Sequence, residues 1–239
     1  MTQPTSAGAR VSRGAGTTRS AEGRLRLLAA AEQLLATRGL EVPNRVIVAA
    51  AGQHNQSAIT YHFRSRAGLI DAIREQHETP IAQHSRHLIS RLPGPEGRTT
   101  RQLIEAHIQP LTAEMLRCSP SHWARFSEML LLDQPLRFAR DGGLPVHAWP
   151  DEPAHPVLPE LLELMVRHLT HLSELEAADR VALTIRFLIS GLARWERDSQ
   201  ADIDHIAQLA PFTLFLTDLA VAMLDAPSSV APQIDGQLG

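Results

Sequence analysis

Apolar residues recur along this chain at the spacing of an α-helix. Four of them share one helical face between residues 20 and 39: Leu27, Ala31, Leu34 and Leu35. Gly39 follows as a helix stop. The same kind of pattern predicts further helices over residues 45–51, 57–63, 65–92, 99–117, 119–133, 157–173, 177–197 and 202–225. The sequence therefore predicts an all-α fold.

Residues 44–69 predict two short helices joined by a tight turn. Gly52 stands where a left-handed residue closes the first helix, and Asn55 or Ser57 is placed to cap the second. In the second helix, Ile59 and Phe63 lie four residues apart and are expected to face inward. Its small and polar residues then face outward, where they suit a DNA major groove. This is the pattern of a helix-turn-helix motif.

The segment from residue 25 to 73 resembles the N-terminal domain of the TetR family of transcriptional repressors. The resemblance is carried by LLAAAEQLLATRG, by AAAGQ followed by YHF, and by SRAGL. The distance from Gly52 to Phe63 is one residue longer than the commonest family spacing, and Thr60 stands where the family usually has tyrosine. The resemblance implies a three-helix DNA-binding domain followed by a larger helical bundle. It also implies that Tyr61, His62 and Arg66 hold phosphates.

The expected DNA-binding residues are polar or small side chains in and around the second short helix: Arg45, Asn55, Gln56, Ser57, Ala58, Thr60, Tyr61, His62 and Arg66. Base selection is expected from residues 56–58, because they open the helix that enters the groove. Arg45 contacts phosphate or base in one interpretation and is an ordinary solvated charge in the other.

Charge divides the chain into unlike halves. Residues 1–74 contain ten arginines and four acidic residues, a net charge of +6, whereas residues 75–239 have a net charge of −9. This asymmetry favours a basic module that meets a polyanion, joined to an acidic module. The predicted domains are a disordered basic arm (1–18), the DNA-binding domain (19–64), an effector-binding and dimerisation domain (65–225) and a disordered tail (226–239).

The C-terminal bundle is expected to enclose a small, largely apolar ligand. A helix beginning at Ser65 and kinked at Pro80 leads into it, and residues 134–157, rich in proline and glycine, predict a long loop beside it. The pocket candidates are residues of facing helices: Leu103, His107, Leu111, Trp123, Phe126, Met129 and Met165. A solid core of the same residues is the rival interpretation, and His107 is either a ligand anchor or a buried core histidine.

Two helical segments, 181–195 and 211–224, are apolar on nearly every side. Such helices need covering all round, so we expect the helices at 177–197 and 202–225 to form a four-helix bundle with a second copy of the chain. A membrane span is not expected, because Arg186, Arg194 and Asp218 interrupt these segments.

The sequence lacks the motifs of common enzymes and of metal or redox sites. The sequence has no G-x-S-x-G, P-loop or H-E-x-x-H motif and no lysine, so we expect neither an enzyme nor a cofactor. The pairs His84/His87 and His168/His171 lack partners at metal-ligand spacing, and Cys118 lacks a second cysteine, so no metal site or redox switch is expected.

No secretion signal opens the chain, which favours a cytoplasmic protein. The predicted function is that of a sequence-specific, homodimeric DNA-binding regulator, a repressor that a small apolar ligand releases from double-stranded operator DNA. The alternative is a helical protein-interaction module whose DNA binding is vestigial.

Overall fold

The computed structural model describes residues 11–118, 120–133, 137–139, 143–146, 157–198 and 204–228. It divides into two compact units, the first ending at Gln76 and the second beginning at His77. The division falls inside one helix, α4 (Arg66–Ile89). The sequence predicts that this helix belongs wholly to the second domain. Its first turns instead belong to unit 1, to which they contribute the buried side chains of Leu69 and Ile73.

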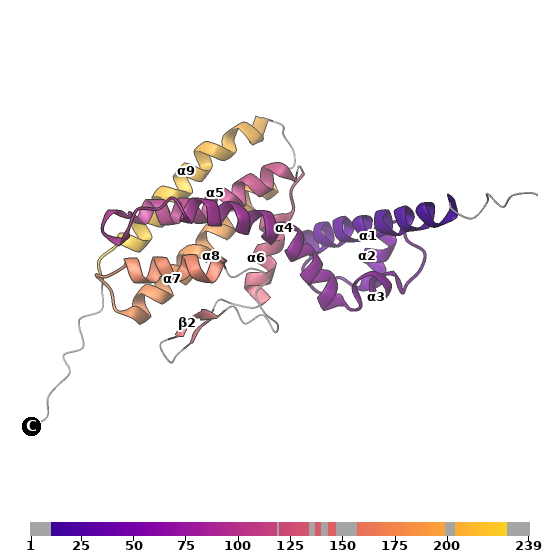
Figure 1. The fold of residues 1–239 in the computed structure, drawn as a ribbon, viewed down its shortest axis with the longest axis horizontal. Helices are drawn as coiled ribbons and strands as arrows, with labels where there is room; N and C mark the ends of the chain where they lie inside the picture. Colours follow the sequence, from indigo (N-terminus) through magenta and orange to yellow (C-terminus); the bar gives the residue numbers. More distant parts are fainter. Residues whose placement is uncertain are drawn as a thin grey trace, which may run out of the picture. The chain divides into compact units, whose positions relative to one another are not determined.

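Unit 1 contains three helices besides the start of α4, and Figure 1 shows them in indigo and purple. They are α1 (Val11–Arg38), α2 (Asn44–Ala50) and α3 (Ala58–Phe63). The predicted inner face of α1 is confirmed, because Leu27, Ala31 and Leu35 are fully buried. Gly39 and Gly52 follow α1 and α2 with φ angles of 86° and 65°, the left-handed conformation that the sequence predicted for Gly52.

The start of α1 differs from the prediction. We expected residues 1–18 to be a disordered arm, but the helix begins at Val11. Once a packed segment such as Leu27–Leu35 has nucleated a helix, adding residues to its end costs little, so the helix extends beyond its apolar face. The rest of the predicted arm, residues 1–10, lies outside the described residues, as does the predicted tail from residue 229 onward.

The described residues of unit 2 form the rest of α4, a short 3₁₀ helix, five α-helices and a small hairpin. The 3₁₀ helix is η1 (Pro95–Gly97), and the α-helices are α5 (Thr100–Arg117), α6 (Trp123–Asp133), α7 (Val157–His168), α8 (Glu174–Asp198) and α9 (Asp204–Asp225). All five α-helices contribute buried residues to one apolar core. Within it, α9 lies beside α5 and α8, and α6 beside α8 (Figure 1).

The predicted loop at 134–157 contains secondary structure. Strands β1 (Arg137–Ala139) and β2 (Gly143–Val146) pair antiparallel, with Arg137 opposite Val146 and Phe138 opposite Pro145. The hairpin contacts α7 and α8. Glycine and proline in this stretch were interpreted as marks of a loop, but a strand of three or four residues is too short to show a clear alternating pattern. The fold remains all-α in class.

Some helices of unit 2 begin at caps that are local in the sequence, and α6 begins at a cap from a distant residue. Thr99 and Gln102 form a reciprocal capping box at the start of α5, as a local pattern can predict. The start of α6 is instead capped by Glu196 of α8, whose carboxylate accepts from the backbone N–H groups of Ala124 (3.2 Å) and Arg125 (3.0 Å). Glu196 also pairs with the buried Arg125 side chain at 3.1 Å. The sequence predicts a helix over 119–133 with Ser119 or Ser121 as its cap. The helix begins at Trp123, whose N–H donates to Ser121 Oγ (3.3 Å), and the contacts from Glu196, more than 70 residues away, cannot be seen in the local sequence.

Candidate nucleic-acid interface

The turn between α2 and α3 is built from backbone hydrogen bonds and one side chain. The N–H of Gln53 donates to the carbonyl of Val48 (3.0 Å), which reverses the chain after Gly52. Asn55 Oδ1 then accepts from the N–H of Ser57 (2.9 Å), so Asn55 stabilises the turn that opens α3. Ser57 is the N-cap residue but makes no capping bond with its side chain. The helix–tight turn–helix arrangement that the sequence predicted is therefore confirmed.

Helix α3 buries one stripe and exposes the other. Ile59 and Phe63 are buried as predicted, but Ala58, which we expected to face outward, is only 4% exposed. Because a helix turns 100° per residue, residues 58, 59, 62 and 63 occupy one continuous stripe, and Ala58 lies on it with Ile59. Ala58 is therefore not placed to contact a base.

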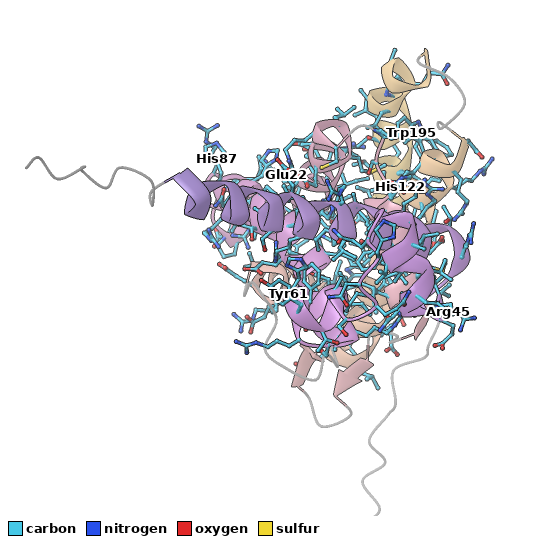
Figure 2. The ribbon with its side chains drawn as sticks, turned by 90° about the vertical axis from the view of Figure 1, so that its right-hand side faces the viewer. Glu22, Arg45, Tyr61, His87, His122 and Trp195 are labelled. Carbon is cyan, nitrogen blue, oxygen red and sulfur yellow. The ribbon has the colours of Figure 1, made fainter. Side chains whose placement is uncertain are left out.

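The opposite stripe of α3 is the exposed one. Tyr61 is 73% exposed, and Figure 2 shows its side chain and that of Arg45 on unit 1. The predicted DNA-binding residues that are exposed are Arg45, Asn55, Gln56, Ser57, Thr60 and Tyr61. His62 and Arg66 are half-buried. The structure thus brings the amide, hydroxyl and phenol groups of residues 55–61 onto one short stretch of surface.

His62 lies at the edge of the buried stripe. Its ring meets Tyr61 edge-on, with ring centroids 4.8 Å apart. Burial, and then the positive charge of Arg24, lower the pKa of His62 below its ordinary value of 6.5. Without DNA, the ring is therefore mostly neutral at pH 7, and its N–H can donate a hydrogen bond to a phosphate.

Two further arginines, which the sequence pattern does not predict as DNA-binding residues, lie at this surface. Arg24 of α1 stacks over the ring of Phe63, with its guanidinium carbon 5.0 Å from the ring centroid. Arg64, the exposed C-cap residue that follows α3, has a φ of 67°, which is uncommon outside glycine. No local pattern identifies Arg24, because it comes to α3 from a helix about forty residues earlier in the chain.

Arg66 is used within the protein. Its Nη1 donates to Asn44 Oδ1 at 2.8 Å, and its Nη2 donates to the carbonyl of Leu40. The guanidinium therefore joins the start of α4 to the segment that leads into α2. Its contact with phosphate, which the family resemblance implies, stays a prediction, and a positioning role is the one that the hydrogen bonds support.

The residues proposed for an effector pocket are buried in unit 2. Six of the seven are less than one-tenth exposed, and Met129 is half-buried. Leu103, Leu111 and Met165 belong to the shared apolar core. Trp123 instead lies against His77, with rings stacked at 4.6 Å, and against Phe126 at 5.9 Å. The predicted residues therefore form a core around α5 and an aromatic group on α6.

Two buried polar atoms on α6 have no hydrogen-bond partner among the described residues. They are the indole N–H of Trp123 and the hydroxyl of Ser127, one helical turn apart. Buried polar groups are nearly always satisfied in native proteins, so a ligand or an ordered water is expected to meet these two.

Among the described residues, neither histidine pair considered as a metal ligand belongs to a group of donors close enough to hold an ion. Within the described part of the chain, the one group of His, Cys, Asp or Glu atoms close enough to hold a metal ion is His77, Glu114 and Cys118. The expectation of no metal site therefore overlooked this group. Sequence spacing gave no signal for it, because His77 comes from α4 and the other two residues from the end of α5.

Helix α9 leaves apolar side chains uncovered. Leu214 is 59%, Phe215 54% and Leu219 38% exposed, while Leu216, Ala220 and Leu224 are buried against the rest of unit 2. By length and composition alone, its residues Ala207–Asp225 would suffice to cross a membrane, and only 28% of that window is buried. Polar contacts hold the helix to α5: Arg101 pairs with Asp218, and Thr100 donates to Asp225.

No family model matches the chain, and no curated protein matches it. Among solved structures, the chain is similar to the multidrug binding protein EbrR in complex with imidazole, with 17% identity and a TM-score of 0.40 over 86% of this chain and 97% of that one. It is also similar to RolR in complex with resorcinol, with 17% identity and a TM-score of 0.37 over 88% and 97% of the two chains. In its own structure, the helices of unit 1 follow the order that the resemblance to the TetR family predicted.

Proposed function

We propose that this chain is a homodimeric, sequence-specific DNA-binding regulator of the TetR type, a cytoplasmic repressor that a small, largely apolar ligand releases from its operator. The observation that carries the proposal is the division of α3 into two faces. Ile59 and Phe63 anchor the helix in unit 1, while Thr60 and Tyr61 remain exposed beside Gln56 and Ser57. A short, anchored helix with amide and hydroxyl groups at its start suits the major groove.

Charge supports DNA as the partner. The ten arginines of residues 1–74 face only four acidic residues in that stretch. Phosphate contacts from arginine supply affinity without regard to sequence, whereas groups at the start of the recognition helix select the bases. Gln56 and Ser57 are therefore assigned to base selection. Tyr61 and His62 are assigned to phosphates because the resemblance to the TetR family implies that role.

The uncovered apolar side chains of α9 support a dimer. Leu214, Phe215 and Leu219 are large apolar groups that one copy of the chain leaves in water. A second copy that packs its own α8 and α9 against them completes a four-helix bundle. A dimer would present two recognition helices, which read successive major grooves when they are about 34–36 Å apart.

The unsatisfied atoms on α6 support a ligand. The aromatic surroundings of Trp123 suit an apolar body, and its indole N–H and the Ser127 hydroxyl would orient one acceptor group on the ligand. The rival is a solid core in which a trapped water serves both atoms.

The proposal is tested by selecting bound sequences from a random DNA pool and measuring affinity against salt. A DNA-binding regulator enriches a near-palindrome, and its affinity falls steeply as salt rises. Replacing Gln56 by Ala should change which sequence is enriched, by about 1–3 kcal/mol per base contact. Replacing Tyr61 by Phe removes only a hydroxyl and should weaken all sequences about equally.

The alternative, a helical interaction module, predicts no enriched sequence and a shallow dependence on salt. Ligand release has a separate test. Apolar compounds that carry a hydrogen-bond acceptor should weaken operator binding by the parent protein. Replacing Trp123 by Phe, which keeps the ring and removes the N–H, should reduce that response while operator binding without ligand is unchanged.

A further inference from the structure

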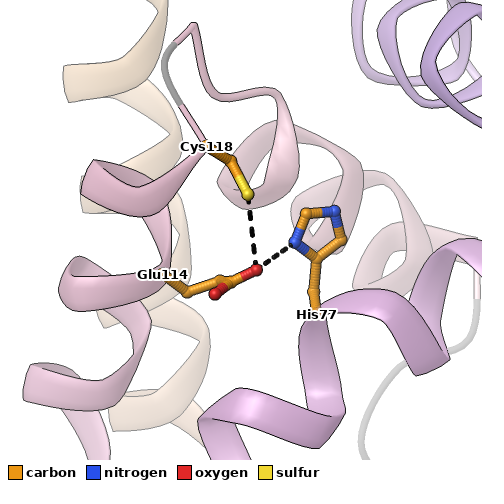
Figure 3. A group of neighbouring side chains, drawn as sticks. All are labelled: His77, Glu114 and Cys118. Carbon is orange, nitrogen blue, oxygen red and sulfur yellow. Dashed lines mark hydrogen bonds and ion pairs between the residues drawn. The ribbon is translucent and has the colours of Figure 1, made fainter.

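Three groups able to bind a metal converge in unit 2. The donor atoms of His77 on α4, Glu114 in the last turn of α5 and Cys118, the C-cap residue of α5, lie within 4.8 Å of one another. Figure 3 shows His77 Nδ1 and Cys118 Sγ both directed at the same carboxylate oxygen of Glu114. The two distances are 2.6 Å and 3.5 Å. Glu114 and Cys118 are four residues apart, so the helix itself sets them on one face.

We propose that these residues form a site for one divalent transition-metal ion, for which Zn²⁺ is the best match. Imidazole nitrogen, carboxylate oxygen and thiolate sulfur are the three donor types that Zn²⁺ accepts, whereas Mg²⁺ and Ca²⁺ take oxygen ligands. Three protein ligands leave one of four tetrahedral positions for water or another small ligand. The side chains of His77 and Glu114 are 1% and 2% exposed and Cys118 is half-buried, so the ion would reach the site from the Cys118 side.

The negative charge at this site is the carboxylate of Glu114, and Arg117 balances it. Burial of Glu114 opposes its ionisation, but hydrogen bonds from Arg117 and His77 outweigh that effect and lower the pKa of the carboxyl group. Arg117 donates to both carboxylate oxygens, at 2.7 Å and 2.5 Å. Its side chain is 54% exposed, so the cation that balances this buried carboxylate can swing into solvent. A bound metal ion would then replace Arg117 as the cation that balances the Glu114 carboxylate.

Metal binding requires small, defined changes. Bond lengths of about 2.0–2.2 Å to nitrogen and oxygen would place Nδ1 and Oε1 about 3.3 Å apart in a tetrahedron, so these atoms must separate by roughly 0.7 Å. The thiol of Cys118 releases its proton to solvent, and Nδ1 of His77 must carry no proton. No electron transfer is involved. Release of protons makes binding weaker at lower pH.

Replacing Arg117 tests the proposal, because a metal site and a plain ion pair predict different changes in metal affinity. If Arg117 competes with the metal for Glu114, Arg117→Gln should tighten metal binding, by roughly tenfold for one pKa unit of interaction removed. If the cluster is only a buried ion pair, the same replacement leaves the protein without measurable affinity for metal. Cys118→Ser should weaken binding by about tenfold or more, because the thiolate is lost.

The probe is Co²⁺, which occupies zinc sites and gives a thiolate-to-cobalt absorption band that reports the sulfur ligand directly. We expect one Co²⁺ per chain, the band in the parent protein, its loss in Cys118→Ser and its displacement by Zn²⁺. His87→Gln, a change at an exposed histidine of the same helix, is the control and should keep the band. Melting curves establish that each variant is folded. Absence of the band from the folded parent protein would overturn the proposal.

A consequence for DNA binding rests on the proposed function. His77 stands on α4, the helix that begins in the DNA-binding unit, so an ion shared with Glu114 would tie that helix to α5. Operator affinity should therefore change with added Zn²⁺ in the parent protein, and the same change should need about tenfold more Zn²⁺ or higher in Cys118→Ser. The cobalt band is measured without DNA, so a failure of the metal site and a failure of the proposed function give different results.

Discussion

Arg66 Nη1 lies 2.8 Å from Asn44 Oδ1, so the first residue of α4 donates a hydrogen bond to the first residue of α2. With its second bond, to the carbonyl of Leu40, Arg66 fixes where the helix-turn-helix begins. Arg66→Ala should therefore lower the stability of unit 1 by about 1–2 kcal/mol and weaken binding to all DNA sequences. Arg45→Ala, at an exposed arginine, is the control: it should alter DNA binding with no change in melting temperature. Equal melting temperatures for both variants would refute the positioning role.

Gly68 is expected to tolerate no side chain. A Cβ atom at this position would lie 2.2 Å from the carbonyl oxygen of Phe63, and a backbone atom cannot move away cheaply. Gly68→Ala should destabilise unit 1 by about 1–3 kcal/mol and shift α3, because Phe63 is its last residue. Gly94→Ala is the matched control, since a Cβ there meets nothing within 4 Å. Thermal unfolding of the two variants measures the difference, and an unaltered Gly68→Ala melt would contradict the geometry.

The lowered pKa of His62 predicts a pH effect with a definite sign. The folded protein keeps this ring neutral at pH values where the unfolded chain, with a pKa of 6.5, takes up a proton. The stability that the neutral His62 ring contributes is therefore fully present above pH 6.5. That stability is lost as the pH falls through the lower pKa that the ring has in the folded protein. A phosphate beside the ring favours protonation, so DNA affinity should rise from about pH 8 to about pH 6.

The pH effect on DNA affinity is measured by titration at constant salt. His62→Gln should flatten the pH dependence, whereas His87→Gln, at an exposed histidine of α4, should leave it unchanged. A pH dependence that survives in His62→Gln would assign the proton to another group.

The exposed face of α9 predicts the oligomeric state. Phe215→Glu places a charge among the uncovered side chains, and burying it at a dimer interface would cost several kcal/mol, so this variant should be a monomer. Leu25→Glu, at a leucine of unit 1 that is 59% exposed, should remain a dimer. Sedimentation at operator-binding concentrations distinguishes the two, and a parent protein that sediments as a monomer would refute the dimer.

Local patterns in the sequence predicted the helices and the closing of α2 by Gly52, because helical periodicity and a left-handed glycine are properties of neighbouring residues. What they missed depends on contacts between distant segments. Ala58 faces inward because it lies on the stripe of α3 that packs against the other helices of unit 1. Helix α6 begins where Glu196 of α8 accepts hydrogen bonds from its first backbone N–H groups. His77 meets Glu114 only because α4 and α5 come together in unit 2. The roles of residues 55–62 in DNA binding stay predictions.

Pro80 has a consequence for how the chain unfolds. It lies within α4 and has no N–H, so the carbonyl of Gln76, four residues earlier, lacks its usual helical donor. Gln76 is also the last residue of unit 1. The hydrogen-bond ladder of α4 is thus interrupted where the two units divide, and melting of unit 1 need not propagate through the helix into unit 2. The amide protons on either side of Gln76 should then exchange with solvent as two separate cooperative groups, each protected by the stability of its own unit.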